Sequence, residues 1–192
     1  MLSSTKAIVL SLQPHSDKAS ILHAYTRAGG RVNYMVYGLG RKHAIGLYTP
    51  FSLIQITADY PSGAMTKPPT LKEAVALSNS CTEEVTQNTV RLFLCEILFH
   101  VLRHPMADEQ MFDFLEQAVQ ELDQTKEPQN FHLQFLASFA AKLGFAMPKE
   151  LPEPRTRAER QEQIRLLCDY FREHVETWVE PRSLEVLMEV FD

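Results

Sequence analysis

The sequence lacks several features that mark common classes of protein. Its 192 residues include only three cysteines and no Cys-x-x-Cys pair, which argues against a zinc ribbon and a disulfide framework. No apolar run reaches the roughly 18 residues that span a bilayer. No basic segment leads to a small-residue cleavage site near the N-terminus. We therefore expect a cytoplasmic protein with no membrane segment, signal peptide or zinc.

Motifs for catalysis and cofactor binding are missing as well. The chain has no Walker loop, no G-x-G-x-x-G opening a helix, and no Ser/His/Asp or Cys/His nucleophile motif. His100 and His104 stand four residues apart on an apolar segment, but no third ligand lies near them in the sequence. We interpret both as surface or packing residues. The sequence predicts a protein that is not an enzyme and has no cofactor or metal ion.

Acidic residues are scarce in the first 72 residues. This segment has only Asp17 and Asp59 against eight basic side chains, a net charge of +6. The other 120 residues hold 22 acidic and 11 basic side chains, a net charge of −11. The asymmetry indicates that the N-terminal third binds a polyanion, with a merely solvated basic surface as the plain alternative. The eight cations are Lys6, Lys18, Arg27, Arg31, Arg41, Lys42, Lys67 and Lys72.

The hydrophobic pattern of the N-terminal part predicts β-strands. Residues 6–60 alternate with period two, are rich in β-branched and aromatic side chains, and are broken by glycine turns. Gly29–Gly30 lies between two of these runs at hairpin spacing. Short antiparallel strands of this kind favour a small barrel or a sandwich. The expected strands cover residues 7–12, 20–26, 31–37, 51–57 and 70–76.

After a proline-rich loop at residues 61–69, the apolar period changes to 3.6 and predicts about five helices. The chain is therefore expected to be an α+β protein, with a β-domain over residues 1–78 and an all-α domain over residues 79–192. Helix starts and ends are marked by capping residues. In chain order they are the capping-box pattern Ser80–Glu83, Asp108, Asn130, the terminal Gly144 and a second capping-box pattern, Thr156–Glu159.

A basic glycine turn is the first candidate for phosphate binding. Gly38-Leu-Gly-Arg-Lys42 follows a predicted strand, and its glycines would let the backbone approach phosphates that Arg41 and Lys42 neutralise. Taken alone, the pattern fits a solvated basic turn equally well.

Aromatic residues are interleaved with these cations, as in proteins that stack single-stranded bases. Tyr34 and Tyr37 have opposite strand parity, so at most one lies on a given face. We expect about half of the set Tyr25, Tyr34, Tyr37, Tyr48 and Phe51 to be interior. The predicted DNA-binding residues are Arg41, Lys42, Arg31, Arg27, Lys18 and Tyr37.

Four arginines cluster near the start of the fourth predicted helix: Arg155, Arg157, Arg160 and Arg165. Because glutamates are interleaved with them, we favour an exposed face with many salt bridges. A docking site for an acidic peptide beside an apolar groove is the alternative.

Several segments, in this order, resemble the bacterial recombination mediator family RecO. The resemblance spans nearly the whole chain, and the C-terminal segments are its most specific part. The matching segments are Lys6–Leu10, Ala19–Thr26, Tyr37–Lys42, Tyr48–Leu53, Arg91–Leu98, Asn130–Leu136, Leu143–Phe145, Tyr170–His174 and Arg182–Phe191.

The resemblance implies an N-terminal OB-fold, a C-terminal helical domain and a place in the nucleoid. It also implies binding of single- and double-stranded DNA, annealing of complementary strands, and help in loading RecA onto DNA coated by single-strand-binding protein (SSB). RecR and the acidic C-terminal tail of SSB are the implied partners. Of the family's basic turn, Arg41 and Lys42 carry over.

The chain departs from the family pattern in two places. The segment after Gly144–Phe145 is reduced to a proline-rich link, and the four-cysteine zinc motif of some members is missing.

Two other functions are compatible with the residues. One is a protein-interaction adaptor with weak nucleic-acid affinity, and the other is an RNA-binding OB-fold protein, because 2′-OH contacts cannot be identified from sequence.

Overall fold

A computed structural model describes residues 1–38, 46–61, 67–78, 80, 82–147 and 149–190. Its contacts divide the chain into two compact units. The barrel unit comprises Met1–Thr82 and Leu102–Asp123, and the helical unit comprises Glu83–Val101 and Gln124–Asp192. The domain boundary between residues 78 and 79 stays a prediction, and in the structure residues 102–123 group with the barrel. No helix in the described part is both long and apolar enough to cross a membrane.

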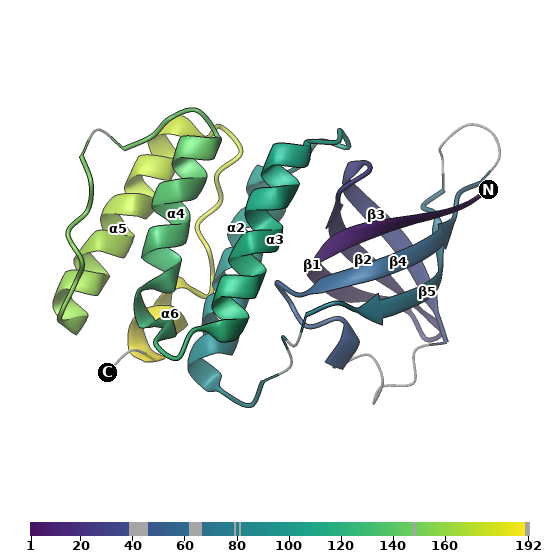
Figure 1. Cartoon of the computed structure of the whole chain (residues 1–192), viewed down its shortest axis with the longest axis horizontal. Coiled ribbons are helices and arrows are strands. Elements are labelled where there is room, and N and C mark those ends of the chain that lie inside the picture. The colour runs from purple at the N-terminus through teal and green to yellow at the C-terminus, as the bar shows by residue number, and fades with distance from the viewer. Residues whose placement is uncertain (39–45, 62–66, 79, 81, 148, 191–192) are drawn as a thin grey trace. The chain divides into compact units, whose positions relative to one another are not determined.

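Five strands form a closed barrel with the order β1-β2-β3-β5-β4 (Figure 1). The long β1 pairs with β4 through its first half and with β2 through its second half, while β3 and β5 meet as a parallel pair. This arrangement confirms the barrel over the sandwich, and confirms the OB-fold that the resemblance implied. The strands are β1 (Leu2–Ser16), β2 (Ala19–Thr26), β3 (Gly30–Tyr37), β4 (Leu53–Asp59) and β5 (Thr70–Ala76).

The barrel interior is filled by alternate residues of each strand, as the period of two predicts. Leu22 and Ala24 of β2 and Tyr34 and Val36 of β3 belong to this core. The phenol of Tyr34 is fully buried, and its hydroxyl is hydrogen-bonded to that of Tyr60 at 2.9 Å. The one polar atom of this buried side chain therefore has a hydrogen-bond partner.

The barrel also has an apolar patch on its outside. Ile8 pairs in register with Tyr25 and Leu53, and all three point away from the interior, yet none is more than 4% exposed. Helix α3 (Glu109–Gln124) belongs to the same unit and contacts the barrel at Arg27, whose guanidinium stands over the Phe112 ring. Its buried side chains are Met111, Phe112, Leu115, Ala118, Val119 and Leu122.

The segment before α3 lies against the turn of the β2–β3 hairpin. A Cβ at Gly30 would lie 2.2 Å from the carbonyl oxygen of Met106, and the φ of Gly30 is +61°. The backbone N–H of Arg31 donates to the carbonyl of His104 at 3.2 Å. Only glycine permits so close an approach in this left-handed conformation.

The helical unit packs four helices and a short 3-10 turn (Figure 1). A run of stacked rings crosses it, with centroid distances of 5.7 Å between Phe135 and Phe139 and 5.9 Å between Phe139 and Phe171. Cys95 and Cys168 are buried in this unit, which confirms them as packing residues. The elements are α2 (Val85–Val101), η1 (Pro128–Asn130), α4 (Phe131–Lys142), α5 (Arg157–His174) and α6 (Leu184–Val190).

Three of the predicted helix signals are confirmed. Asp108 accepts the N–H of Met111 at 2.9 Å, Gly144 has a φ of +92° after α4, and Thr156 and Glu159 form the full capping box of α5.

The prediction from Ser80 was wrong. Helix α2 begins at Val85, and the Ser80 hydroxyl instead donates to the Asp123 carboxylate at 3.0 Å. A charged acceptor makes a stronger hydrogen bond than a neutral one, and Ser80 belongs to the barrel unit rather than to the helix start. Asn130 stands at the N-cap of α4, but its side chain donates to the carbonyl of Pro154.

Candidate nucleic-acid interface

The outer surface of the β2–β3 hairpin carries polar and apolar side chains that face away from the core. Because Leu22 and Tyr34 point inward, the alternate pairs point outward, and the register places Ile21 opposite Met35 and His23 opposite Asn33. Strand β1 adds two residues beside them. We call this surface the hairpin face. It comprises Ser11, Gln13, Ile21, His23, Arg31, Asn33, Met35 and Tyr37.

A polar network crosses the middle of the hairpin face. The distance between His23 Nδ1 and Asn33 Oδ1 is 2.7 Å, so the imidazole N–H donates to the amide oxygen. Arg31 Nη2 lies 3.4 Å from the same nitrogen. Burial lowers the pKa of His23, the bond to Asn33 opposes this shift, and the charge of Arg31 adds to it. His23 is therefore a neutral donor at pH 7, beside a cation.

Arg31 keeps its charge although it is half-buried. Burial, and then the nearby charge of Arg103, lower the pKa of Arg31 to about 10. The guanidinium is thus still protonated at neutral pH. The hairpin face therefore presents a permanent cation near its turn, with a second arginine close to it.

Lys18 and Tyr37 come together at the open end of the hairpin. Tyr37 pairs in register with Ala19, and the N–H of Gly38 approaches the carbonyl of Lys18 at 3.4 Å. Lys18 is exposed, and Tyr37 is 60% exposed. Gly38, the first residue of the basic turn, has a φ of +69°. Arg41 and Lys42, the other two predicted residues of that turn, lie outside the described residues.

Arg27 and Arg31 lie near the closed end of the same hairpin. Arg31 pairs with Tyr25, whereas Tyr37 pairs with Ala19 six residues away. At about 3.3 Å per residue, the two groups of predicted residues are roughly 20 Å apart. The structure therefore places the four predicted residues that it describes in two pairs rather than in one cluster.

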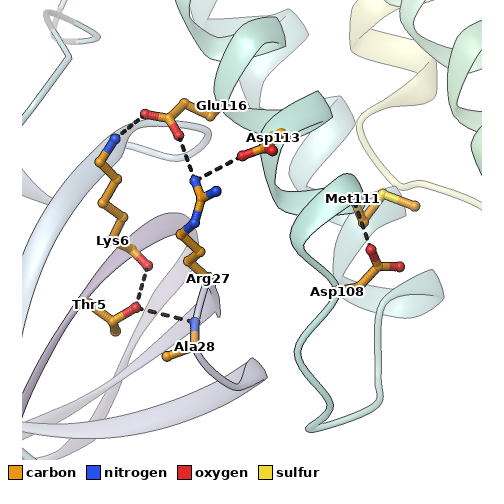
Figure 2. Close-up of polar contacts among 8 residues, drawn as sticks. All are labelled: Thr5, Lys6, Arg27, Ala28, Asp108, Met111, Asp113 and Glu116. Carbon is orange, nitrogen blue, oxygen red and sulfur yellow. Dashed lines mark hydrogen bonds and ion pairs between the residues drawn. The ribbon is translucent and has the colours of Figure 1, made fainter.

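Arg27 is engaged by acidic side chains of α3 (Figure 2). Its Nη1 lies 2.8 Å from Asp113 and 3.7 Å from Glu116, and the guanidinium stands 5.7 Å above the Phe112 ring. Lys6 Nζ contacts the other oxygen of Glu116 at 2.6 Å. These two cations of the basic segment are thus part of an internal ion network.

Four of the five aromatic residues considered for stacking are interior. Tyr25, Tyr34, Tyr48 and Phe51 are buried, whereas Tyr37 is exposed. The opposite orientation of Tyr34 and Tyr37 is confirmed, and more than the expected half of the set is interior. The reason is the outer patch, where Tyr25 points away from the barrel but is buried all the same.

Sequence reasoning missed His23, Asn33 and Arg103. Strand parity was a sufficient signal for the first two, because both share the parity of Arg31. No local signal identified Arg103, since it reaches Arg31 only through the close approach of the chain at Gly30.

The arginine cluster of the helical unit is divided between two sides of α5. Arg157 and Arg160 line a hollow with the apolar side chains of Ile164, Leu187 and Met188. Arg165 lines a separate open groove. His132 also lines the hollow, where burial and then the charge of Arg160 lower its pKa to about 3. The hollow has a volume of only about 10 Å³, so it places two cations beside apolar side chains but is too small to enclose a side chain of a ligand.

Metal binding finds no support in the part of the chain that the structure describes. Within it, no three His, Cys, Asp or Glu side chains are grouped so that they could hold a metal ion.

Two family models match the chain in order. The model described as "Recombination protein O N terminal" matches residues 1–67, which include the first four strands. The model described as "Recombination protein O C terminal" matches residues 82–148, which include α2, α3 and α4.

Curated relatives agree with these matches. The DNA repair protein RecO of Porphyromonas gingivalis is 31% identical over 152 residues, which cover 75% of this chain and 61% of that protein. The RecO of Bacteroides fragilis gives the same identity and coverage over 151 residues. The RecO of Christiangramia forsetii is 26% identical over an alignment of 240 residues that covers both chains fully.

The alignments with the P. gingivalis and B. fragilis proteins thus cover less than two thirds of the length of those two proteins. The full alignment has 240 positions for the 192 residues of this chain, so it includes gaps. Taken with the barrel and the helical unit, these matches show that the chain belongs to the recombination protein O family of DNA repair proteins.

Proposed function

We propose that this protein is a recombination mediator that binds single- and double-stranded DNA and anneals complementary strands. With RecR, it would assist the loading of RecA onto DNA coated by SSB. The observation that carries the proposal is the open end of the hairpin face, where Tyr37 is exposed beside Lys18 at the start of the basic turn. The work would take place in the cytoplasm, at the nucleoid.

The chemistry of this end suits a nucleic-acid backbone rather than a particular base sequence. Lys18, together with Arg41 and Lys42 of the turn, would neutralise phosphates and release counterions. The ring of Tyr37 would stack on an unpaired base, which every base permits. A mediator needs this combination, because it must bind strands of any sequence.

Binding of a fluorescent single-stranded oligonucleotide, measured by anisotropy across a salt series, tests the proposal. We expect Arg41→Ala/Lys42→Ala to lose affinity and to lower the salt slope by up to about 1.4, which corresponds to two phosphate contacts. The matched control is Lys126→Ala/Lys142→Ala, which removes two exposed cations from the helical unit. It should leave the slope unchanged.

Two outcomes would favour other functions. Absence of binding by the wild type at low salt would favour the protein-interaction adaptor, provided that partner binding is retained. A clear preference for RNA over DNA at equal salt would favour the RNA-binding protein.

The hollow beside α5 supports the second part of the proposal, the SSB tail. Arg157 and Arg160 would pair with the acidic side chains of the tail, and the partly exposed Met188 beside them would contact its apolar residue. A labelled tail peptide should bind the wild type and should bind Arg157→Ala/Arg160→Ala at least tenfold more weakly. Arg155→Ala/Arg165→Ala is the control, because these two arginines do not line the hollow. Equal binding by both variants would contradict this assignment.

A further inference from the structure

Lys6 and Arg27 are two cations of the barrel that lie next to each other and are not part of the hairpin face. Their backbones are joined, since the N–H of Arg27 donates to the carbonyl of Lys6 at 3.0 Å, next to the paired residues Ala7 and Thr26. Strand pairing therefore holds two cations side by side, whatever α3 does. Like charges held so close repel one another unless an anion lies between them.

Glu116 fills the place of that anion. Its Oε1 lies 2.6 Å from Lys6 Nζ and its Oε2 lies 3.7 Å from Arg27 Nη1, so one carboxylate bridges both cations. Asp113 adds a second contact to Arg27 at 2.8 Å. Figure 2 shows both acids reaching from α3 toward the two cations. A phosphate group, with its several acceptor oxygens, would satisfy the same donors.

The two cations are accessible from solvent. The side chain of Lys6 is 40% exposed and that of Arg27 is 38% exposed, so both reach the rim of the contact. Helix α3 groups with the barrel and has its own buried side chains, among them Phe112, whose ring lies under Arg27. The carboxylates could therefore rotate away while the helix stays in place.

From this geometry we infer that Lys6 and Arg27 form a second phosphate-binding site, which the carboxylates of Asp113 and Glu116 occupy in the absence of nucleic acid. The inference rests on the proposed function and adds regulation to it. A polyanion must displace the internal carboxylates before it gains these two contacts. The pair of Arg27 with Asp113 is exposed at 38% and 58%, and such a pair stabilises a protein only slightly, so a nucleic-acid backbone can compete for it. Glu116 is only 15% exposed, so its contacts with Lys6 and Arg27 are the harder ones to displace.

The test is the salt dependence of oligonucleotide binding by Asp113→Asn/Glu116→Gln. We expect tighter binding than in the wild type and a slope steeper by up to about 1.4, which corresponds to two more phosphates on a single strand. The matched control is Glu109→Gln/Glu121→Gln, which removes the same charge from α3 without touching Lys6 or Arg27. It should bind with the slope of the wild type.

A second comparison assigns the gained contacts. Lys6→Ala/Arg27→Ala placed in the Asp113→Asn/Glu116→Gln background should return the slope to the wild-type value. If the double carboxylate variant does not fold, Glu116→Gln alone carries the test, because Glu116 contacts both cations.

The alternative is that the ion pairs only hold α3 on the barrel. That role predicts a lower unfolding temperature for Asp113→Asn/Glu116→Gln and a salt slope equal to that of the control, a result that would overturn the inference and leave the proposed function standing. Absence of binding by the wild type and by all variants at low salt would instead overturn both.

Discussion

The two ends of the hairpin face hold the same kinds of side chain in different surroundings. At the open end, Lys18 and Tyr37 are exposed. At the closed end, Arg27 is paired with acids of α3, and Arg31 is half-buried beside the chain at His104. The difference teaches that a cation in a basic segment is open to a ligand without competition only where no carboxylate or passing chain contacts it, and that elsewhere the ligand must first displace that group.

Substituting the glycines at the two ends of the hairpin should give the largest change, a loss in the free energy of unfolding. Gly30→Ala should lower the free energy of unfolding by roughly 3 kcal/mol, because its Cβ would meet the Met106 carbonyl in a strained left-handed conformation. Gly38→Ala should cost only about 1 kcal/mol, since φ is positive there but, among the residues that the structure describes, no atom other than those of its chain neighbours lies within 4 Å. Urea unfolding of both variants measures the difference. Equal losses would contradict the close approach of residues 104–106 to Gly30.

The buried His132 should make the free energy of unfolding depend on pH, whereas an exposed histidine should not. In the unfolded chain His132 titrates near pH 6.5, but burial and then Arg160 lower its pKa to about 3 in the folded protein. Between these values the unfolded state binds more protons, so the free energy of unfolding falls as pH falls from 6.5 toward 3. This group should contribute a loss of about 2 kcal/mol by pH 5.

Comparison with His132→Phe isolates that contribution. The variant keeps an aromatic ring against Phe93, whose centroid lies 6.0 Å from that of His132. Its unfolding free energy should fall less between pH 7 and pH 5 than that of the wild type. Parallel curves would show that His132 does not stay neutral in the fold.

Removing one cation from either end should give the smallest effect. The two removals should differ in kind, because one changes DNA binding and the other changes stability. Lys18→Ala should lower the salt slope for a single-stranded oligonucleotide by about 0.7, which is one phosphate contact, with little change in stability. Arg27→Ala should leave the slope of the wild type unchanged, because a phosphate at Arg27 displaces a carboxylate rather than a counterion, and should lower the unfolding free energy by up to about 1 kcal/mol. The reverse pattern would place nucleic acid at the closed end.

Prediction from sequence succeeded where a local rule governs the structure. All five strands and the capping box of Thr156 were found from period and spacing, because alternation and capping act within a few residues. Ser80 shows the limit of such rules. Its capping-box pattern was present, but Asp123, distant in sequence, offered a stronger acceptor.

The candidate site shows the same limit. Lys18 and Tyr37 were predicted as binding residues and lie together at an exposed edge, as strand pairing requires. Arg27 was predicted from the same charge pattern, but its partners are more than eighty positions away in the chain. Whether these residues bind DNA stays a prediction until the oligonucleotide measurements are made.

The sequence by itself determined the β-rich and helical parts, the strand parity that turns Tyr37 outward, and the excess of cations in the first 72 residues. These properties depend on side chains that are neighbours along the chain. Only the tertiary structure decided which cations stay available, because α3 brings Asp113 and Glu116 onto the barrel and Gly30 admits the segment beside Arg31. Charge acts through space, so its partners are set by folding rather than by order in the sequence.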